Sequence, residues 1–159
     1  MTHETECRFE SLLDLPRERA FSLFVDRPDL WWSSPFSEAG EGPVEAGIEP
    51  FPGGRCYEID KKGRRRIWGT VLSIEPPLYL RLAWQVSQEG VEIADPAAAS
   101  RVMVNFRESG DATRLEIVHD AFLRHGEHGP SYLEQMRRPE GWPRIIANLK
   151  EAARTAVWR

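Results

Sequence analysis

Apolar and polar residues alternate along several short runs of this chain, and the clearest series lies at 52–84. In its last run, Leu80, Leu82 and Trp84 alternate with other residues, which is typical of a strand with one buried face. A Lys-Gly pair and a Glu-Pro-Pro triplet separate neighbouring runs, so each run is expected to fold back on the one before it. The segment therefore predicts an antiparallel sheet.

The same patterns predict further elements on both sides of this segment. Additional strands are expected at 6–13, 44–48, 101–108 and 113–120. Apolar residues three or four apart predict a helix that begins at Pro16, a short helix at 29–32 and another at 131–138. The residues at 86–100 are small and acidic, and we expect a loop there that could cover a pocket.

The last part of the chain shows one apolar stripe at helical spacing. Five residues spaced four, three, four and three apart form it: Trp142, Ile146, Leu149, Ala153 and Ala156. A long amphipathic helix packs its stripe across the concave face of a curved sheet. The expected α+β fold is a curved antiparallel sheet of six to seven strands around a long C-terminal helix, with two short helices after the first strand. We expect a single domain over residues 1–159.

Charge and composition exclude several classes of function. The formal net charge of −4 argues against a general nucleic-acid binder, because phosphate binding requires a basic face. The basic run at 61–66 is interpreted as a solvated hairpin tip, with contact to phosphate or an acidic ligand as the alternative. No apolar run approaches the roughly 20 residues of a membrane span. The charged N-terminal residues and the spacing of Cys7 and Cys56 predict a cytoplasmic protein with reduced thiols.

No catalytic motif, metal site or cofactor is predicted. The densest group of potential metal ligands comprises His119, Asp120, His125, Glu127 and His128. Zinc requires three or four ligands that converge at roughly 2.0–2.3 Å, whereas glycines at 126 and 129 favour a loop. The serines and the Gly-Gly pair lack the motifs of hydrolases and phosphate loops. Cys56 is interpreted as a buried, inert thiol.

The chain contains six tryptophans, and aromatic side chains that bury roughly 150–250 Å² each need a core or a pocket. We interpret the aromatic set as the lining of a cavity, with ordinary core packing as the alternative for each residue. The candidate ligand-binding residues are Trp31, Trp32, Tyr57, Trp68, Trp84, Phe106, His119 and Trp142. Trp31 and Trp32 are expected near its mouth, whereas alternation places Arg81 and Arg107 on the outer face.

Six short motifs occur in an order that resembles a known family. They are Pro52-Gly53-Gly54, Gly69 with Val71, Glu75-Pro76-Pro77, Leu80 with Trp84, the run 113–119 and Gly141-Trp142. Together they resemble the activator of heat-shock protein 90 ATPase homologue-like family, within the START-like (SRPBCC, helix-grip) superfamily. The resemblance implies a long helix gripped by the sheet and a cavity between them.

The resemblance implies that the cavity binds a hydrophobic or aromatic small molecule without catalysis, in a monomer or homodimer. One alternative is a cyclase/aromatase-like or hydrolase-like enzyme that uses the same cavity, for which His119 is the candidate acid or base. Another is a chaperone-binding or other protein-interaction module, as the family name implies. The sequence leaves these alternatives open.

Overall fold

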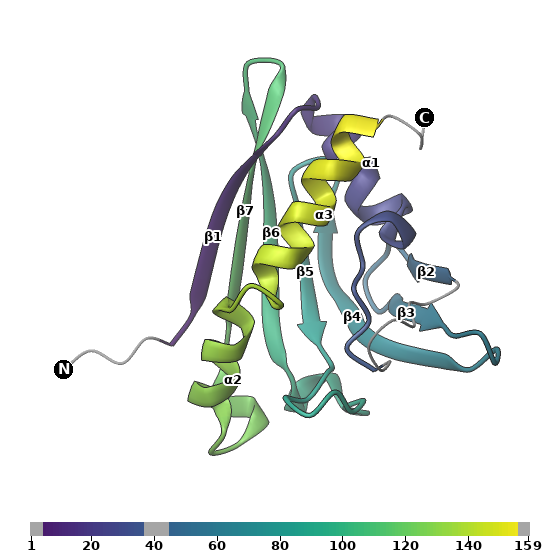
Figure 1. Cartoon of the computed structure of the whole chain (residues 1–159), viewed down its shortest axis with the longest axis vertical. Helices are drawn as coiled ribbons and strands as arrows, with labels where there is room; N and C mark the ends of the chain where they lie inside the picture. Colours follow the sequence, from purple (N-terminus) through teal and green to yellow (C-terminus); the bar gives the residue numbers. More distant parts are fainter. Residues whose placement is uncertain (1–4, 37–44, 156–159) are drawn as a thin grey trace.

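The computed structural model describes residues 5–36 and 45–155, in which seven strands form one antiparallel sheet (Figure 1). The strands are β1 (Cys7–Leu13), β2 (Glu45–Ile48), β3 (Arg55–Ile59), β4 (Arg65–Glu75), β5 (Tyr79–Trp84), β6 (Ser100–Ser109) and β7 (Ala112–Asp120). Their order across the sheet is β1-β7-β6-β5-β4-β3-β2. Consecutive strands from β2 to β7 are thus neighbours, while β1 pairs with β7, and the predicted curved antiparallel sheet is confirmed.

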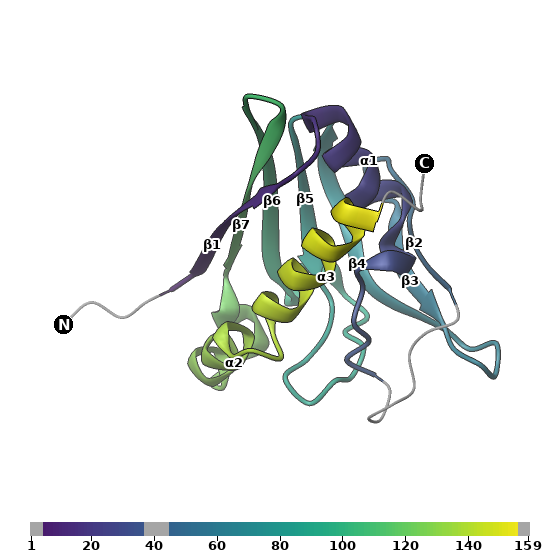
Figure 2. The ribbon, with the colours of Figure 1, turned by 45° about the horizontal axis from the view of Figure 1, so that its top comes forward.

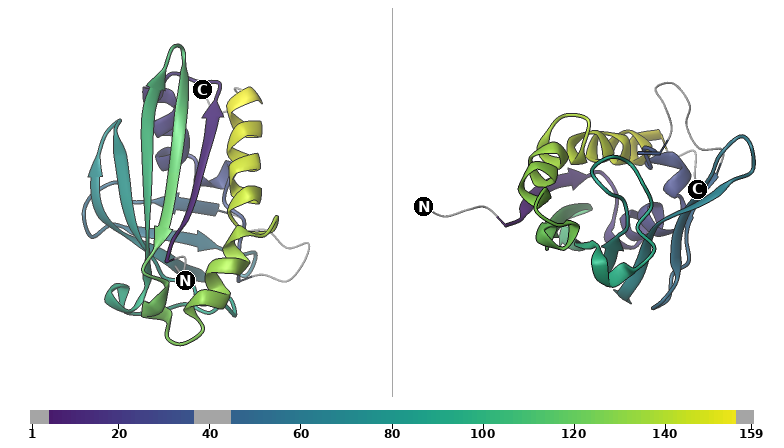
Figure 3. Two further views of the ribbon diagram at one scale, coloured as in Figure 1. Left: turned by 90° about the vertical axis from the view of Figure 1, so that its left-hand side faces the viewer. Right: turned by 90° about the horizontal axis from the view of Figure 1, so that it is seen from below.

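Three α-helices and three single 3₁₀ turns complete the fold. They are α1 (Arg17–Asp26), η1 (Pro28–Leu30), η2 (Pro96–Ala98), η3 (Phe122–His125), α2 (Gly129–Arg137) and α3 (Trp142–Thr155). Helix α3 crosses the concave face of the sheet, and α1 lies on the same face beside its C-terminal end (Figures 2 and 3). This is the helix-grip arrangement that the sequence predicts. The predicted second short helix after β1 is the 3₁₀ turn η1.

Helices α2 and α3 are separated by a tight turn at Gly141. A Cβ atom at this position would lie 2.3 Å from the carbonyl oxygen of Met136, so only glycine fits against that backbone. The turn redirects the chain so that Trp142, the first residue of α3, is buried at the concave face. The Gly-Trp pair therefore sets the start of the long helix.

The buried face of α3 differs from the predicted stripe at Ile145, which replaces Ile146, and at Ala152, which the stripe did not include. The buried residues are Trp142, Ile145, Leu149, Ala152 and Ala153. Ile146, which the stripe included, is only half-buried, and residue 156 lies outside the described part of the chain. Because Ile145 and Ile146 are adjacent, either of them fits the helical spacing of the stripe almost equally well. In the structure Ile145 is the buried one.

The predicted hairpin tip at 61–65 is exposed. At its base the guanidinium of Arg65 lies 4.6 Å from the ring centre of Tyr57, and Arg66 lies similarly over Phe36. The predicted loop at 86–100 contains a β-bridge between Val86 and Glu92 as well as η2. No described helix is long and apolar enough to cross a membrane.

Candidate functional site

Seven of the eight candidate residues meet in one aromatic cluster between the sheet and the helices. They are Trp31, Trp32, Trp68, Trp84, Phe106, His119 and Trp142, each at most 6% exposed. Trp32 and Trp68 stack with ring centres 3.9 Å apart, and the edge of Trp84 packs against both. The rings fill the space below α3 by packing on one another. They form a packed aromatic core.

Most of the indole N–H groups in this cluster have internal acceptors. Trp31 donates to the Phe24 carbonyl oxygen (3.1 Å), Trp32 to Glu58 Oε1 (3.0 Å), Trp84 to the Tyr132 hydroxyl (2.8 Å) and Trp142 to His119 Nδ1 (3.0 Å). Internal acceptors take the place of water for the N–H groups of Trp31 and Trp32. Both residues therefore lie in the core, and not at the mouth of the cavity where they were expected. Trp68 Nε1 has no hydrogen-bond partner among the described residues.

Tyr57, the eighth candidate, lies apart from the cluster. Its neighbours Cys56 and Glu58 are buried on the inner face of β3, so Tyr57 points to the opposite side. There its ring covers Gly47 on β2, where a Cβ atom would lie 2.5 Å from the tyrosine oxygen. Arg65 packs over the ring. The structure thus gives Tyr57 a place in sheet packing, away from the other seven residues.

His119 lies at the edge of the cluster with both ring nitrogens occupied. Nδ1 accepts the Trp142 N–H, and Nε2 lies 2.7 Å from Ser100 Oγ. Burial lowers the pKa of His119 well below its ordinary value, and the neighbouring His125 lowers that pKa further. His119 is therefore a neutral residue of the core. No group of three metal-competent side chains forms within residues 5–36 and 45–155.

The two cysteines are buried thiols without a disulfide. Burial raises the pKa of Cys7 to about 11 and raises the pKa of Cys56 as well. Both side chains are therefore protonated near neutral pH, and neither is activated as a nucleophile. This agrees with the interpretation of Cys56 as an inert core residue.

Glu58 is a buried carboxylate that the sequence did not single out. It is 2% exposed, and its two oxygens accept hydrogen bonds from Trp32 Nε1 (3.0 Å) and Ser34 Oγ (2.9 Å). These bonds tie the segment that follows η1 to the inner face of β3. Alternation from Cys56 could have placed Glu58 inward, but acidic residues are too frequent in this chain for one to stand out.

Replacing Glu58 with alanine is expected to lower the free energy of unfolding by about 1–3 kcal/mol, because the buried Trp32 N–H and the half-buried Ser34 hydroxyl lose their acceptor. Glu58→Gln is the matched control, and it should cost less because its side-chain oxygen can still accept one of the two bonds. Urea denaturation of the three proteins measures the difference. Equal stability of wild type and Glu58→Ala would contradict this role.

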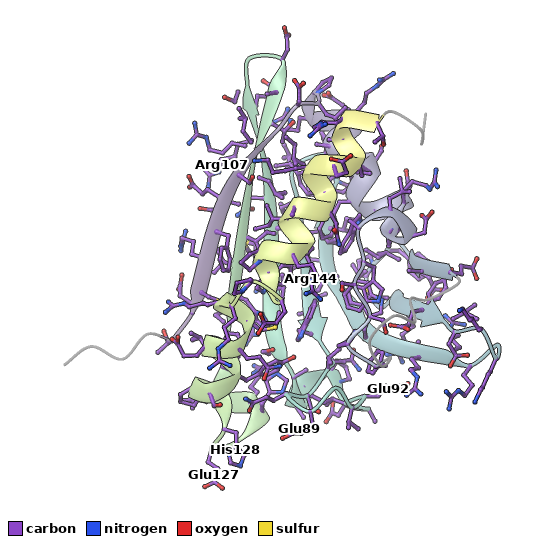
Figure 4. The ribbon with its side chains drawn as sticks, viewed as in Figure 1. Glu89, Glu92, Arg107, Glu127, His128 and Arg144 are labelled. Atoms are coloured by element: carbon purple, nitrogen blue, oxygen red, sulfur yellow. The ribbon has the colours of Figure 1, made fainter. Side chains whose placement is uncertain are left out.

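A pocket of about 290 Å³ lies next to the aromatic cluster. It is bounded by the segment 33–35, the loop 86–90, α2 and the first turn of α3. Four buried apolar side chains form its inner wall: Trp84, Val86, Met136 and Ile145. Its rim carries polar and charged groups, among them Glu89 and Arg144, which Figure 4 labels. Trp84 is the only one of the eight candidates that reaches this pocket.

The pocket could not have been assembled from sequence periodicity. The residues at 33–35 and 86–90 lie in loops, and their contribution depends on how those loops fold over the helices. The one available signal was the unusual length of the segment at 86–100.

Arg107 lies on the outer face of the sheet, where it pairs with Glu116, as alternation predicts.

Comparisons with known proteins agree with this geometry. The sequence model of a family described as activator of Hsp90 ATPase homolog 1-like protein matches residues 14–154. The chain belongs to this family. A search of the curated proteins found no significant match.

This chain resembles several solved structures in fold. An anthrahydroquino-γ-pyrone synthase, Txn09, is 26% identical, covering 94% of this chain and 97% of its own, with a TM-score of 0.67. The self-sacrificing resistance protein CalC of Micromonospora echinospora is 23% identical over 99% and 100% of the two chains, with a TM-score of 0.66. An AHSA1-like protein of Aeromonas hydrophila is 18% identical over 95% and 93%, with a TM-score of 0.65.

Proposed function

We propose that this protein binds a hydrophobic or aromatic small molecule in the pocket beside Trp84. The observation that carries the proposal is the pocket itself, which has a buried apolar wall and a polar rim. Ligand sites combine these two features, and their volumes start near 300 Å³. The pocket is therefore suited to a small ligand of roughly one or two rings.

The rigidity of the inner wall supports this proposal. The indole of Trp84 is held by its hydrogen bond to Tyr132, whose hydroxyl in turn donates to the Val86 carbonyl oxygen (2.7 Å). These contacts fix three of the residues that face the ligand before it binds, which reduces the entropy lost on binding. A flat aromatic ligand would stack against or beside Trp84.

An enzyme remains the second candidate, and the 26% identity with the synthase Txn09 favours it. His119, the acid or base suggested by the sequence, does not line the pocket and uses both nitrogens internally. Catalysis would therefore depend on groups at the rim, such as Glu89 or Glu140. Turnover of a compound shown to bind is the measurement that separates an enzyme from a binding protein.

Filling the pocket should abolish binding. Ser33 lies in the lining and is half-buried, so Ser33→Trp places an indole in the ligand space. With the aromatic probe 8-anilinonaphthalene-1-sulfonate, we expect saturable fluorescence in the wild type and a loss of affinity of about tenfold or more in Ser33→Trp. Ser22→Trp is the matched control, since Ser22 is half-buried on α1 away from the pocket.

The same experiment can contradict the proposal. If the probe binds both variants as it binds the wild type, the pocket is not its site. Native mass spectrometry of the freshly purified protein complements the titration, because a retained hydrophobic compound would identify the ligand class. That compound is then the substrate to test for turnover.

A further inference from the structure

A chain of hydrogen bonds with a single direction runs from Trp142 to His125. An indole N–H can only donate, so His119 Nδ1 accepts it and the His119 proton lies on Nε2. Nε2–H then donates to Ser100 Oγ, whose own hydrogen is left to donate to His125 Nε2 at 2.6 Å. The backbone N–H of Ser100 donates to the same nitrogen at 3.1 Å. His125 Nε2 is thus an acceptor, and in the neutral ring the proton lies on Nδ1.

The N–H group at His125 Nδ1 has no acceptor for its hydrogen. The atom is shielded from water and has no hydrogen-bond partner among the described residues. A buried donor without an acceptor costs about 1–3 kcal/mol, and such a group in a native protein calls for an explanation. Either a small movement of the side chain brings Nδ1–H to an acceptor within the protein, or a bound molecule supplies the acceptor.

A second pocket adjoins this histidine. It has a volume of about 260 Å³ and lies between the loop 87–93, η3 and the start of α2. His125 lines it together with Arg124 and His128, and the exposed Glu89 contributes a carboxylate on the far loop. Figure 4 shows His128 and Glu89 at the end of the molecule away from the long helix, whereas Arg144 lies on α3. Residues 87–89 and Tyr132 separate this pocket from the one beside Trp84.

Arg124 is the group in the lining of the second pocket that can pair with an anion. Its guanidinium offers several N–H donors, of which one reaches the Ala97 carbonyl oxygen at 3.4 Å. An oxyanion would accept from Arg124 and from His125 Nδ1–H without presenting a hydrogen of its own.

We propose that the pocket beside His125 is a second binding site, one for the oxyanion of a carboxylate or phosphate group that accepts from His125 Nδ1–H and pairs with Arg124. Because Nδ1 lies beneath the surface of the pocket, the imidazole must turn slightly for this bond to form. The turn lengthens the contact between His125 Nε2 and Ser100, so binding should be visible at both residues.

The test is an NMR titration of the uniformly ¹⁵N-labelled, full-length protein with inorganic phosphate and, separately, with benzoate. We expect the ¹⁵N shifts of unliganded His125 to show the Nδ1–H tautomer. We also expect a saturable shift of the His125 ring nitrogens and the Ser100 amide with at least one probe. Arg124→Gln should weaken that binding by about tenfold or more, because a charge-assisted bond is lost. Arg144→Gln, at the rim of the other pocket, is the matched control and should leave it unchanged.

Each other outcome overturns the proposal. The assigned direction of the hydrogen bonds from Trp142 to His125 is wrong if His125 carries its proton on Nε2. The site is wrong if neither probe shifts His125, or if the two arginine variants weaken binding equally. Arg124 is exposed, so its substitution should leave folding intact even where a His125 variant does not fold. The probe that binds more tightly distinguishes a phosphate from a carboxylate ligand.

Discussion

Replacing Trp68 with alanine is expected to lower the free energy of unfolding by about 3–5 kcal/mol. The side chain is fully buried, stacks on Trp32 and meets the edges of Trp31 and Trp84. Alanine would remove the centre of the aromatic cluster and leave a cavity that the neighbouring rings, held by their own hydrogen bonds, cannot close. Both the lost burial and the unfilled cavity destabilise the folded protein.

Trp68→Phe is the informative control for this prediction. Because Trp68 Nε1 has no partner among the described residues, phenylalanine deletes an unsatisfied donor while it keeps an aromatic ring in place. We therefore expect Trp68→Phe to cost clearly less than Trp68→Ala in urea denaturation. A phenylalanine variant as unstable as the alanine variant would mean that the N–H has a partner and that its loss, and not the cavity, dominates.

Much of the fold followed from local patterns. The connections β3–β4, β4–β5 and β6–β7 are short turns between runs of alternating residues, and consecutive strands of this kind pair with one another. The pairing of β1 with β7, in which Cys7 lies opposite His119, joins residues far apart in sequence. No pattern in the sequence predicted that contact. Local periodicity carries no information about which distant strand closes a sheet.

The candidate site was harder to predict, and β3 shows why. Alternation along β3 holds, with Cys56 and Glu58 buried, but Tyr57 was chosen as a candidate because it is aromatic. The register between β3 and β4 shifts between Cys56 and Tyr57, where β4 contributes one extra residue, Trp68, so alternation is interrupted on β4. The tryptophans pack as one set, but whether rings line a cavity or fill it depends on the spacing between sheet and helices, which composition does not contain.

The two pockets share a physical origin in this arrangement. The aromatic cluster fills the middle of the space between α3 and the sheet, and the pockets beside Trp84 and His125 both lie at the end of that space where loops meet α2. Loop 87–89 and Tyr132 form a common wall, and Gln88 Nε2 is bonded to Ser131 Oγ across it (2.8 Å). A ligand that displaces this wall from one side would change the shape of the pocket on the other.

The free energy of unfolding is expected to fall as the pH drops below about 6.5. Burial holds the pKa of His119 well below its ordinary value, and burial also lowers the pKa of His125. In the unfolded chain both histidines regain an ordinary pKa near 6.5. Between the folded and unfolded values, the unfolded chain binds protons that the folded protein does not. Each histidine therefore removes up to about 1.4 kcal/mol of stability per pH unit in this range.

Urea denaturation between pH 7.5 and pH 5, a window of roughly 2.5 units, isolates the histidines. The carboxyl groups with a lowered pKa, such as Glu116, which Asn105 stabilises by a hydrogen bond, stabilise the fold above their unfolded pKa near 4 and lose that effect only at lower pH. His119→Gln retains an acceptor for Trp142 and a donor for Ser100, so it should flatten the pH profile even if it lowers stability overall. His128→Gln removes an exposed histidine and should leave the profile unchanged. A wild-type profile that stays flat from pH 7.5 to pH 5 would show that the buried histidines do not lose a proton on folding, and the assignment of neutral histidines in the hydrogen-bond chain from Trp142 to His125 would then be wrong.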